Sequence, residues 1–497
     1  MSIHLTMLLD MAAGGYDDRV AIGHKQGGLS YAQLQASAGA AAALAQSKGA
    51  GSIAMLAETS EAMPIALFGA AWAGIPFAPL NYRLSYDQLQ ALVARLDTPL
   101  IICDAPVNFE GGEVMLTADF MEAVSQPTEA PEPAWDADDV AVLLFTSGTT
   151  AAPKAALLRH HNLTSYVLGT TEFGSFDDDA ATLMCVPPYH IAAVSNILTN
   201  LYTGRRVVPL PKFTPETWLD TITNEHITHA MVVPTMLARI VEAIREGHPY
   251  DASSLASIAY GGARMPITVI EAALEMFPNA GFVNAYGLTE TSSTITLLGP
   301  DDHRDAFASD DPAVRARLGS AGRPVPGLEM EIRDAEGNVV GANVVGDVFV
   351  RGPQVAGEYA GMGSVVDAEG WFATKDRGHV DDEGYLFIEG RSDDTIIRGG
   401  ENIAPAEIED VLVRHPAILE AAVIGPADEE WGQRITAVVV LREGQTVDVD
   451  ELRAWARERL RASKTPDQIL IREELPHTET GKLLRRVLLA EIEGRDA

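Results

Sequence analysis

Alanine-rich stretches with helical character alternate with short apolar runs over much of the chain. Tyr31 to Gln46 is typical of the alanine-rich stretches, whereas Leu100 to Cys103 and Met231 to Val233 are typical of the apolar runs. A continuous apolar run predicts a strand that is buried on both faces, and such strands belong to largely parallel sheets covered by helices. The sequence therefore predicts an α/β fold of layered subdomains.

The pattern changes after about residue 319. Met330 and Ile332, and further along Val348 and Val350, alternate with other residues around a turn-rich stretch. This alternation predicts a β-rich part with antiparallel strands. We assign it to the end of a large N-terminal domain that covers residues 1–392.

Residues 393–497 form a smaller predicted unit of mixed α+β type. Strands are expected at 421–424, 435–441 and 468–472. A helix is expected at 448–462, because Asp448 and Glu451 have the spacing of a capping pair and an apolar stripe follows. We therefore expect a separate small C-terminal domain that begins at Asp393.

The composition limits the partners and the compartment. The 497 residues include 70 acidic and 36 basic ones, so the net charge of -34 repels nucleic acid and anionic membranes. Two cysteines, Cys103 and Cys185, are too few for a disulfide framework. We expect a cytoplasmic protein, and the sequence leaves open whether it forms a homodimer.

Neither the apolar segment 64–80 nor the start of the chain has the features of a membrane span or a signal peptide. Pro64 to Leu80 is uncharged for 17 residues, but it contains glycines and prolines and is short for a membrane span, so we expect a buried helix followed by a turn. Met1 to Asp10 lacks the basic start of a signal peptide. We expect no integral membrane association.

A hydroxyl-rich segment follows the predicted buried strand Val140 to Phe145. It reads Thr-Ser-Gly-Thr-Thr-Ala-Ala-Pro-Lys from Thr146 to Lys154. Its hydroxyls, backbone N–H groups and lysine suit a polyphosphate, although a solvated Ser/Thr turn is an equally good interpretation of this cluster alone. Neither a Walker A pattern nor a G-x-G-x-x-G pattern occurs in the sequence.

Four further segments decide between these interpretations. They run from Asn284 to Glu290, from Gly370 to Asp376, from Gly390 to Gly400 and from Leu475 to Lys482. Together with Phe145 to Lys154, and in the same order, they resemble the signature segments of the adenylate-forming superfamily, which includes acyl-CoA synthetases. The resemblance spans nearly the whole chain and implies an enzyme that uses ATP to activate a carboxylic acid.

The resemblance also implies the nucleotide site. In the family, two segments enclose adenine, and here these are Gly261 to Ala263 and the segment of Tyr286. The acid that accepts the ribose hydroxyls in relatives matches Asp376, and Arg391 would add a cation near ribose or phosphate. Glu290 is expected in a strand-end loop, where a carboxylate can hold Mg²⁺. Taken one at a time, Tyr286 would more simply be a core aromatic residue, and Asp376 and Arg391 would more simply be members of surface ion pairs. The implied nucleotide-binding residues are Thr146, Ser147, Gly148, Thr149, Thr150, Lys154, Gly261, Gly262, Ala263, Asn284, Ala285, Tyr286, Gly287, Thr289, Asp376, Arg391 and Lys482.

Lys482 is the implied catalytic cation. Attack of a carboxylate on the α-phosphorus brings two anions together, and an ammonium group lowers that barrier. An ordinary exposed lysine is the alternative. With Lys482, the expected catalytic residues are Thr146, His190 and Glu290.

The C-terminal domain is expected to be mobile. Asp393 matches the family's hinge, and rotation about it would withdraw Lys482 and present a glycine-containing loop to the acyl-adenylate. The implied CoA-binding residues are Arg398, Gly399, Gly400 and Glu401. The glycines are equally compatible with a simple turn.

The acid is expected beside His190, which matches the family position next to the acyl carboxylate. Ala192 and Ala193, together with Gly261 and Gly287, leave room for a bulky or extended group. A fatty, aryl or other bulky apolar acid is therefore expected. His226 and His229 lie three residues apart, which would suit a metal ion on a helix. No third ligand is evident, so we interpret the two histidines as structural.

Four positions depart from the family pattern. Ala151 and Ala155 replace usual glycines of the phosphate loop, Lys375 replaces the glycine before the ribose-binding acid, and Ser463 replaces a tyrosine before Lys464. These replacements leave the acidic, hydroxyl and lysine side chains of the implied site in place. The departures bear on nucleotide affinity and rate more than on the type of reaction.

Three functions follow in order of preference. The first is an acyl-CoA synthetase that uses ATP, Mg²⁺ and CoA to form an acyl-adenylate and then a thioester, with release of AMP. The second is an acyl-AMP ligase or free-standing adenylation enzyme that loads a carrier-protein thiol. The third is a silent nucleotide- or acyl-binding protein, against which the intact Lys482, Glu290 and Asp376 argue.

Overall fold

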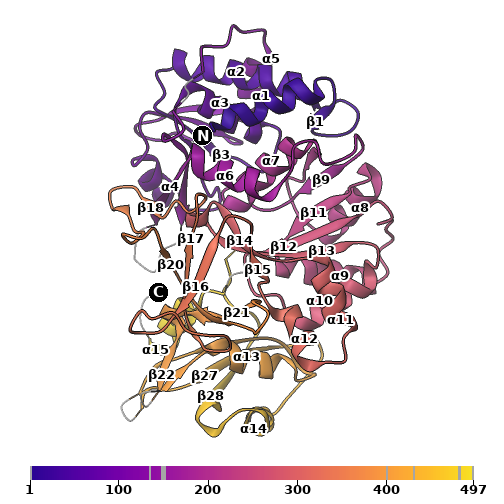
Figure 1. Cartoon of the computed structure of the whole chain (residues 1–497), viewed down its shortest axis with the longest axis vertical. Coiled ribbons are helices and arrows are strands. Elements are labelled where there is room, and N and C mark those ends of the chain that lie inside the picture. Colours follow the sequence, from indigo (N-terminus) through magenta and orange to yellow (C-terminus); the bar gives the residue numbers. More distant parts are fainter. Residues whose placement is uncertain are drawn as a thin grey trace. The chain divides into compact units, whose positions relative to one another are not determined.

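The structure is a computed structural model of the chain, and it describes residues 3–133, 136–146, 153–398, 401–428, 431–478 and 483–494 (Figure 1). The chain divides into two compact units. Unit 1 comprises residues 1–329 and 350–372, and unit 2 comprises residues 330–349 and 373–497. The chain thus passes from one unit to the other three times.

The first sheet of unit 1 has eight strands in the order β19-β18-β8-β7-β4-β3-β5-β6. Strands β7, β4, β3, β5 and β6 are parallel to their neighbours in this series, whereas β8, β18 and β19 add antiparallel pairs at one side. The strands are β3 (Ser52–Leu56), β4 (Phe77–Pro79), β5 (Pro99–Cys103), β6 (Glu113–Leu116), β7 (Val140–Thr146), β8 (Lys154–Arg159), β18 (Glu358–Tyr359) and β19 (Gly363–Ser364).

The second sheet of unit 1 has nine strands in the order β15-β14-β13-β12-β11-β9-β10-β1-β2. The strands from β13 to β1 in this order are parallel, and the antiparallel pairs lie at the two sides. They are β1 (Val20–Ile22), β2 (Leu29–Ser30), β9 (Ala181–Met184), β10 (Arg206–Pro209), β11 (His229–Val232), β12 (Ser257–Gly261), β13 (Gly281–Leu288), β14 (Ser293–Leu298) and β15 (Arg323–Pro324).

Helices connect most of the parallel strands of unit 1. Helix α2 begins at a capping box formed by Ser30 and Gln33, and α3 ends at Gly74, whose φ of 71° suits a residue without a side chain. None of the helices in the described part of the chain is long and apolar enough to cross a membrane. The helices are α1 (Leu5–Tyr16), α2 (Tyr31–Ser47), α3 (Ala62–Ala73), α4 (Tyr86–Val93), α5 (Thr117–Ser125), α6 (His160–Thr170), α7 (Ile191–Thr203), α8 (Pro215–Glu225), α9 (Pro234–Arg245), α10 (Ile267–Met276), α11 (Pro300–Ala308) and α12 (Pro312–Ala316).

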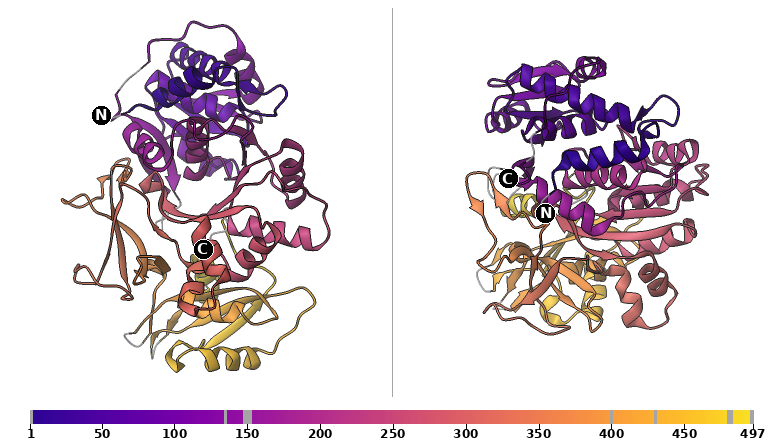
Figure 2. Two further views of the ribbon diagram at one scale, coloured as in Figure 1. Left: turned by 45° about the vertical axis from the view of Figure 1, so that its right-hand side comes forward. Right: turned by 45° about the horizontal axis from the view of Figure 1, so that its top comes forward.

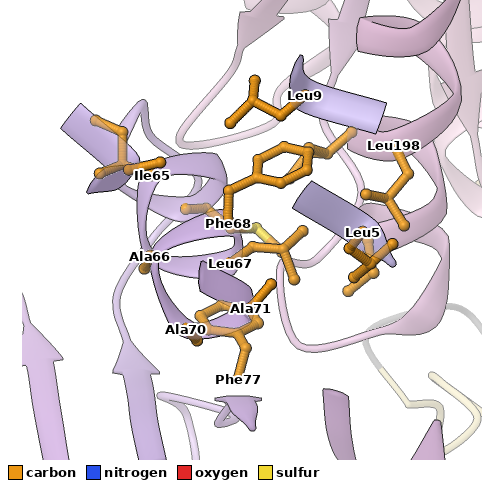
Figure 3. Packing of buried hydrophobic residues seen from close by; sticks show 14 of the residues in the cluster. Leu5, Leu9, Ile65, Ala66, Leu67, Phe68, Ala70, Ala71, Phe77 and Leu198 are labelled. Carbon is orange, nitrogen blue, oxygen red and sulfur yellow. The ribbon is translucent and has the colours of Figure 1, made fainter. Parts of the chain in front are cut away.

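Small residues let α2 and α3 pack closely in the main core of unit 1. A Cβ atom added at Gly69 of α3 would lie 2.6 Å from the Cβ atom of Ala41 in α2. Figure 3 shows Phe68 of α3 among side chains of α1, with Leu198 of α7 nearby. This core fixes α7, at whose first turn the predicted acid site lies.

Unit 2 contains a four-stranded sheet with the order β16-β17-β20-β21 and a three-stranded sheet with the order β24-β27-β28. Alternate residues of β24 face different helices: Ala421 and Val423 share a core with α13 and α14, whereas Ala422 and Ile424 share one with α15. Figure 2 shows this part of the ribbon from two sides. The elements are β16 (Glu329–Arg333), β17 (Gly346–Arg351), β20 (Phe372–Val380), β21 (Leu386–Arg391), β22 (Ile396–Arg398), β23 (Glu401–Ile403), α13 (Pro405–Val413), β24 (Ile418–Ile424), β25 (Ala427–Asp428), β26 (Gly432–Gln433), β27 (Thr436–Leu441), α14 (Val449–Arg459), β28 (Gln468–Arg472) and α15 (Arg485–Glu493).

The α/β prediction is confirmed, including the large and small parts and the largely parallel sheets. The predicted helix 448–462 is α14, and Asp448 caps it by accepting hydrogen bonds from the N–H groups of Asp450 and Glu451. The segment 64–80 is a buried helix and a turn as expected, but it also contains β4, which the sequence analysis missed. The division at residue 393 and the mobility of the C-terminal part remain predictions.

Candidate active site

The predicted phosphate loop connects two antiparallel strands. β7 and β8 form a hairpin in which Thr146 is paired with Lys154, and the Thr146 hydroxyl donates to the Lys154 carbonyl over 3.4 Å. Both ends of the loop are thereby fixed in the eight-stranded sheet. The predicted ligands Ser147, Gly148, Thr149 and Thr150 lie outside the described residues, as does Ala151.

Ala155 explains one departure from the family pattern. It lies in β8, it is buried in a small apolar cluster, and it pairs with Phe145. A methyl group at this position packs against neighbouring side chains, so the replacement of glycine is compatible with the strand. Arg95 contacts both chain segments at this end of the hairpin. Its guanidinium lies 5.0 Å from the Phe145 ring centroid and donates to the Pro153 carbonyl over 2.6 Å.

The two predicted adenine segments lie at the ends of neighbouring parallel strands. Gly261, the last residue of β12, is paired with Ala285 in β13, and Gly262 and Ala263 follow it directly. Gly262 has a φ of 85°, which favours glycine. The fold therefore brings the segments 261–263 and 284–287 together toward the carboxyl ends of two parallel strands, where open α/β sheets commonly bind ligands.

Two of these glycines are required by neighbouring backbone. A Cβ atom at Gly261 would lie 2.3 Å from the Ala285 carbonyl oxygen, and one at Gly287 would lie 1.8 Å from the Ser293 carbonyl oxygen. Gly287 also lies at the irregularity in the pairing of β13 with β14. The absence of side chains here is explained by strand packing, so it is not by itself evidence for space for the acid.

Glu290 lies in a short 3-10 turn, Thr289–Thr291, between β13 and β14. Its backbone carbonyl accepts hydrogen bonds from the N–H groups of Ala356 (2.9 Å) and Gly357 (3.1 Å). Its carboxylate accepts one from the hydroxyl of Tyr359. The carboxylate is therefore held in one orientation in a strand-end loop, which is where the sequence placed it.

Residues 354–359 contribute a part of the site that sequence analysis missed. The buried amide of Gln354 donates to the carbonyls of Thr291 (3.1 Å) and Thr294 (2.8 Å). Tyr359 reaches Glu290 from a strand 69 positions away. No local pattern marks these residues, because their partners are distant in sequence.

His190 precedes α7 as its N-cap residue, and it is partly exposed. Burial lowers the pKa of its imidazole from 6.5 to about 4, so the ring is neutral near pH 7. Its ring packs against Tyr189, which forms an edge-on pair with Tyr82 at a centroid distance of 5.7 Å. Ala192 is partly exposed, whereas Ala193 is fully buried in the core.

The predicted ribose residues face each other in unit 2. Asp376 in β20 is the register partner of Arg391 in β21, and Arg391 Nε lies 3.3 Å from Asp376 Oδ1. Arg391 also donates to the Thr374 carbonyl over 3.2 Å. Lys375 has a φ of 64°, which explains why glycine is usual at this position in the family.

The predicted CoA segment is described only in part. Arg398 donates to Asp467 over 2.8 Å and its cation lies 4.7 Å from the Trp431 ring centroid, and Glu401 is exposed. Gly399 and Gly400 lie outside the described residues, and the Asp393 backbone belongs to a 3-10 turn, Ser392–Asp394.

Lys482 also lies outside the described residues. Described residues on either side of it form contacts in unit 2. His477 forms an antiparallel bridge with Leu483, and Arg485 pairs with Glu409 at 2.8 Å and with Asp394 at 3.3 Å.

His226 and His229 have different surroundings. His226 ends α8 in a left-handed conformation, while the ring of His229 packs edge-on against Phe176 at 4.9 Å. Among the described residues, no group of three or more His, Cys, Asp or Glu side chains is arranged to hold a metal ion.

Two family models match the sequence. The AMP-binding enzyme model matches residues 9–360, and the model of the AMP-binding enzyme C-terminal domain matches residues 407–482. The chain is 32% identical over 450 residues to 2-succinylbenzoate–CoA ligase of Bacillus cytotoxicus, and 89% of each chain is covered. It is 31% identical to indoleacetate–CoA ligase of Aromatoleum aromaticum, over 97% of this chain and 96% of that relative.

Solved structures have the same fold. ATP-bound MatB from Rhodopseudomonas palustris has a TM-score of 0.86 at 26% identity, with 99% of each chain covered. The o-succinylbenzoate CoA synthetase from Bacillus subtilis in complex with its acyl-adenylate intermediate has a TM-score of 0.83 at 28% identity, with 97% of each chain covered. The same synthetase has been solved with ATP and a magnesium ion, and that structure also has a TM-score of 0.83 at 28% identity, covering 96% of this chain and 98% of the other.

Proposed function

The chain belongs to the AMP-binding enzyme family and is an AMP-forming acid–CoA ligase, and we propose that its acid is an aryl or arylalkyl carboxylic acid. The observation that carries this choice is the similarity to two ligases whose names contain aromatic acids, 2-succinylbenzoate and indoleacetate, at 32% and 31% identity over most of the chain. It narrows the wider expectation of a fatty, aryl or other bulky apolar acid.

The surroundings of His190 support an aromatic acid. The neutral imidazole, Tyr189 and Tyr82 form a run of ring contacts at the start of α7. Ring faces and edges of this kind favour offset or edge-on contact with another ring. An N-terminal helix end also favours the carboxylate of the acid.

The residues of unit 1 fit a nucleotide with its cation. Glu290 offers one oriented carboxylate, and Mg²⁺ in proteins is commonly held by one or two carboxylates together with substrate phosphates and water. Lys154 adds a positive charge at the end of the hydroxyl-rich loop. When bound, Mg²⁺ would neutralise charge on the phosphates.

The proposed reaction has two steps. A carboxylate oxygen of the acid attacks the α-phosphorus of ATP, and pyrophosphate leaves. The thiol sulfur of CoA then attacks the acyl carbonyl carbon, losing its proton, and AMP leaves with the electrons of the broken C–O bond. In this scheme Thr146 and Lys154 orient the leaving phosphates, His190 lies beside the acid, and Lys482 stabilises the charge that develops in the first step.

The second step is proposed to use a turn of the C-terminal domain about Asp393. Arg398 to Glu401 would then face the acyl-adenylate, with Gly399 and Gly400 allowing close passage of the pantetheine arm. A cytoplasmic location is part of the proposal, since both cysteines are buried and free.

A substrate panel tests the proposal. ATP–pyrophosphate exchange is measured with benzoate, phenylacetate, indoleacetate and 2-succinylbenzoate, and with straight-chain acids of matched carbon number. We expect at least one aromatic acid to have a kcat/KM about tenfold or more above its matched straight-chain acid. AMP release with that acid should depend on CoA.

Each other outcome has a definite meaning. A preference for straight-chain acids would refute the aryl proposal. Exchange without CoA-dependent AMP release would favour loading of a carrier-protein thiol. An absence of exchange with every acid would contradict the assigned ligase activity.

A further inference from the structure

One side chain connects the two parts of the predicted phosphate site. The Tyr359 hydroxyl donates a hydrogen bond to Glu290 Oε1, and the Lys154 Nζ atom lies 5.3 Å from the centroid of the Tyr359 ring. We propose that Tyr359 is a positioning residue: it orients the Glu290 carboxylate for a divalent cation and supports the Lys154 ammonium at the phosphates. The inference rests on the proposed function.

Tyr359 is itself held firmly. It lies in β18, where it pairs with Ala156, and the next N–H group, that of Ala360, donates to the Ala155 carbonyl over 2.9 Å. The preceding residue, Glu358, accepts hydrogen bonds from Arg159 Nε (2.9 Å) and Nη2 (2.8 Å). A two-pronged pair of this geometry restricts both partners, so the phenol approaches Glu290 from a fixed strand.

The same segment also holds the Glu290 backbone. Its carbonyl accepts from the N–H groups of Ala356 and Gly357, and Gln354 donates to the carbonyls of Thr291, the last residue of the turn, and of Thr294 in β14. With the backbone fixed, the remaining freedom of Glu290 is in its side-chain torsions. The hydrogen bond from Tyr359 restricts these torsions.

The chemistry of a carboxylate makes this arrangement useful. An ionised carboxylate has two oxygens and accepts several hydrogen bonds or metal contacts, so one phenol donor at Oε1 leaves Oε2 available. A neutral donor orients the group without cancelling its charge. A cation in the same place would compete with the metal ion.

The ring of Tyr359 has a separate effect on Lys154. Among the described residues Lys154 forms no ion pair with a carboxylate, and its ammonium lies 5.3 Å from the ring centroid. The negative face of an aromatic ring attracts an ammonium more weakly than a carboxylate does. Lys154 therefore keeps its charge available for phosphate oxygens.

The competing explanation is that Tyr359 only stabilises the edge of the sheet. Calorimetric binding of ATP, measured with Mg²⁺ and with a chelator, separates the two explanations without requiring turnover. The measured quantity is the ratio of the ATP dissociation constant without Mg²⁺ to the constant with Mg²⁺. A purely structural role would not change this ratio.

Two variants remove the two functions of Tyr359 in turn. Tyr359→Phe keeps the ring and removes the hydroxyl, so we expect the Mg²⁺ ratio to fall about fivefold or more while ATP binding without Mg²⁺ is unchanged. Tyr359→Leu also removes the ring, and we expect ATP binding without Mg²⁺ to weaken by about threefold or more in addition.

The matched control is Tyr86→Phe. Tyr86 is 52% exposed and its hydroxyl donates to the Asn108 carbonyl over 2.9 Å, so this variant loses a comparable hydrogen bond elsewhere in unit 1. It should leave the ratio unchanged. In a Glu290→Gln background, Tyr359→Phe should have no further effect on the ratio, because the two residues act as one unit.

The inference is overturned if Tyr359→Phe keeps the wild-type ratio, whether or not its melting temperature falls. It is also overturned if the Glu290→Gln and Tyr359→Phe effects simply add. A wild-type protein that binds ATP with Mg²⁺ but shows no acid-dependent exchange would refute the proposed function, and the test of Tyr359 would still give its answer.

Discussion

Asp376 and Arg391 are direct partners across two antiparallel strands, with Arg391 Nε 3.3 Å from Asp376 Oδ1. The carboxylate is the less exposed of the two groups, at 11% against 31% for the arginine side chain. A carboxylate paired in this way is held in one orientation, as its predicted role of accepting two ribose hydroxyls would require.

Asp376→Asn tests this relationship. The amide retains the shape but loses the charge, so we expect the KM for ATP to rise about tenfold or more and the free energy of unfolding to fall by about 1–3 kcal/mol, since Arg391 loses its partner. Exchange kinetics and urea unfolding measure the two effects. Asp347→Asn is the control, because its carboxylate accepts from Ser392 at 2.8 Å in the same unit; an equal rise in KM there would contradict a specific role for Asp376.

The backbone of Lys375 has a positive φ, which is unfavourable for a residue with a side chain but not for glycine. With φ at 64°, Lys375→Gly should leave the free energy of unfolding unchanged or raise it by up to about 1 kcal/mol. The control is Ala373→Gly, at an exposed position of the same strand without a positive φ, which should lower stability by about 0.5–1 kcal/mol. Equal losses in the two urea titrations would show that the lysine conformation is not strained.

Lys482→Ala should separate the half-reactions. If the ammonium stabilises charge in the attack on the α-phosphorus, adenylation slows by about two orders of magnitude or more, while thioester formation from preformed acyl-adenylate is nearly unchanged. Rapid-quench assays of each half-reaction measure this. Arg472→Ala, which removes a surface cation paired with Glu491, is the control, and an equal loss in both half-reactions for Lys482→Ala would refute the assignment.

The stacked rings of His4 and His160 predict acid sensitivity. Their centroids are 3.6 Å apart, and burial lowers the pKa of His4 from 6.5 to about 4 and that of His160 to about 3. The nearby imidazoles of His4 and His161 further lower the pKa of His160, while Asp136 opposes the shift in the pKa of His4. As the pH falls, the unfolded chain therefore binds protons at a higher pH than the folded chain. The contribution of these two neutral imidazoles to the free energy of unfolding is fully present above about pH 6.5 and is lost as the pH falls toward 4.

His160→Gln should make the pH dependence less steep. We expect the slope of the unfolding free energy below about pH 6.5 to decrease by up to about 1.4 kcal/mol per pH unit. Urea unfolding at several pH values measures it. Asn162→Ala, at a buried position of the same helix that does not titrate, should lower stability without changing the slope; an unchanged slope in His160→Gln would contradict the prediction.

Local sequence patterns predicted helices and strands well where apolar burial or a helix cap determines the structure. The strand expected at 468–472 is β28, and the helix expected at 31–46 is α2, because apolar burial and a capping box act over a few residues. Strand β4 was missed since three residues ending in a proline give too little periodicity. The largely parallel sheets followed from the apolar runs, but the order of their strands did not.

The candidate site was predictable only where it matched the family segments. The resemblance implied that the segments of Gly261 and Ala285 lie close together around adenine, whereas the contact between Tyr359 and Glu290 depends on the return of residues 350–372 to unit 1. An alternating pattern indicates a strand but not the sheet it joins. Long-range hydrogen bonds of this kind need the fold before they can be named.

The return of residues 350–372 to unit 1 has a practical consequence for anyone who divides the gene. A fragment that stops at Glu329 lacks β18 and β19, so β8 becomes an unpaired edge strand of its sheet. Glu290 also loses its hydrogen bond from the Tyr359 hydroxyl. Unit 1 therefore cannot be excised, fused or exchanged as a single uninterrupted cassette. A usable fragment would have to include residues 330–349, which belong to unit 2, or replace them with a designed linker.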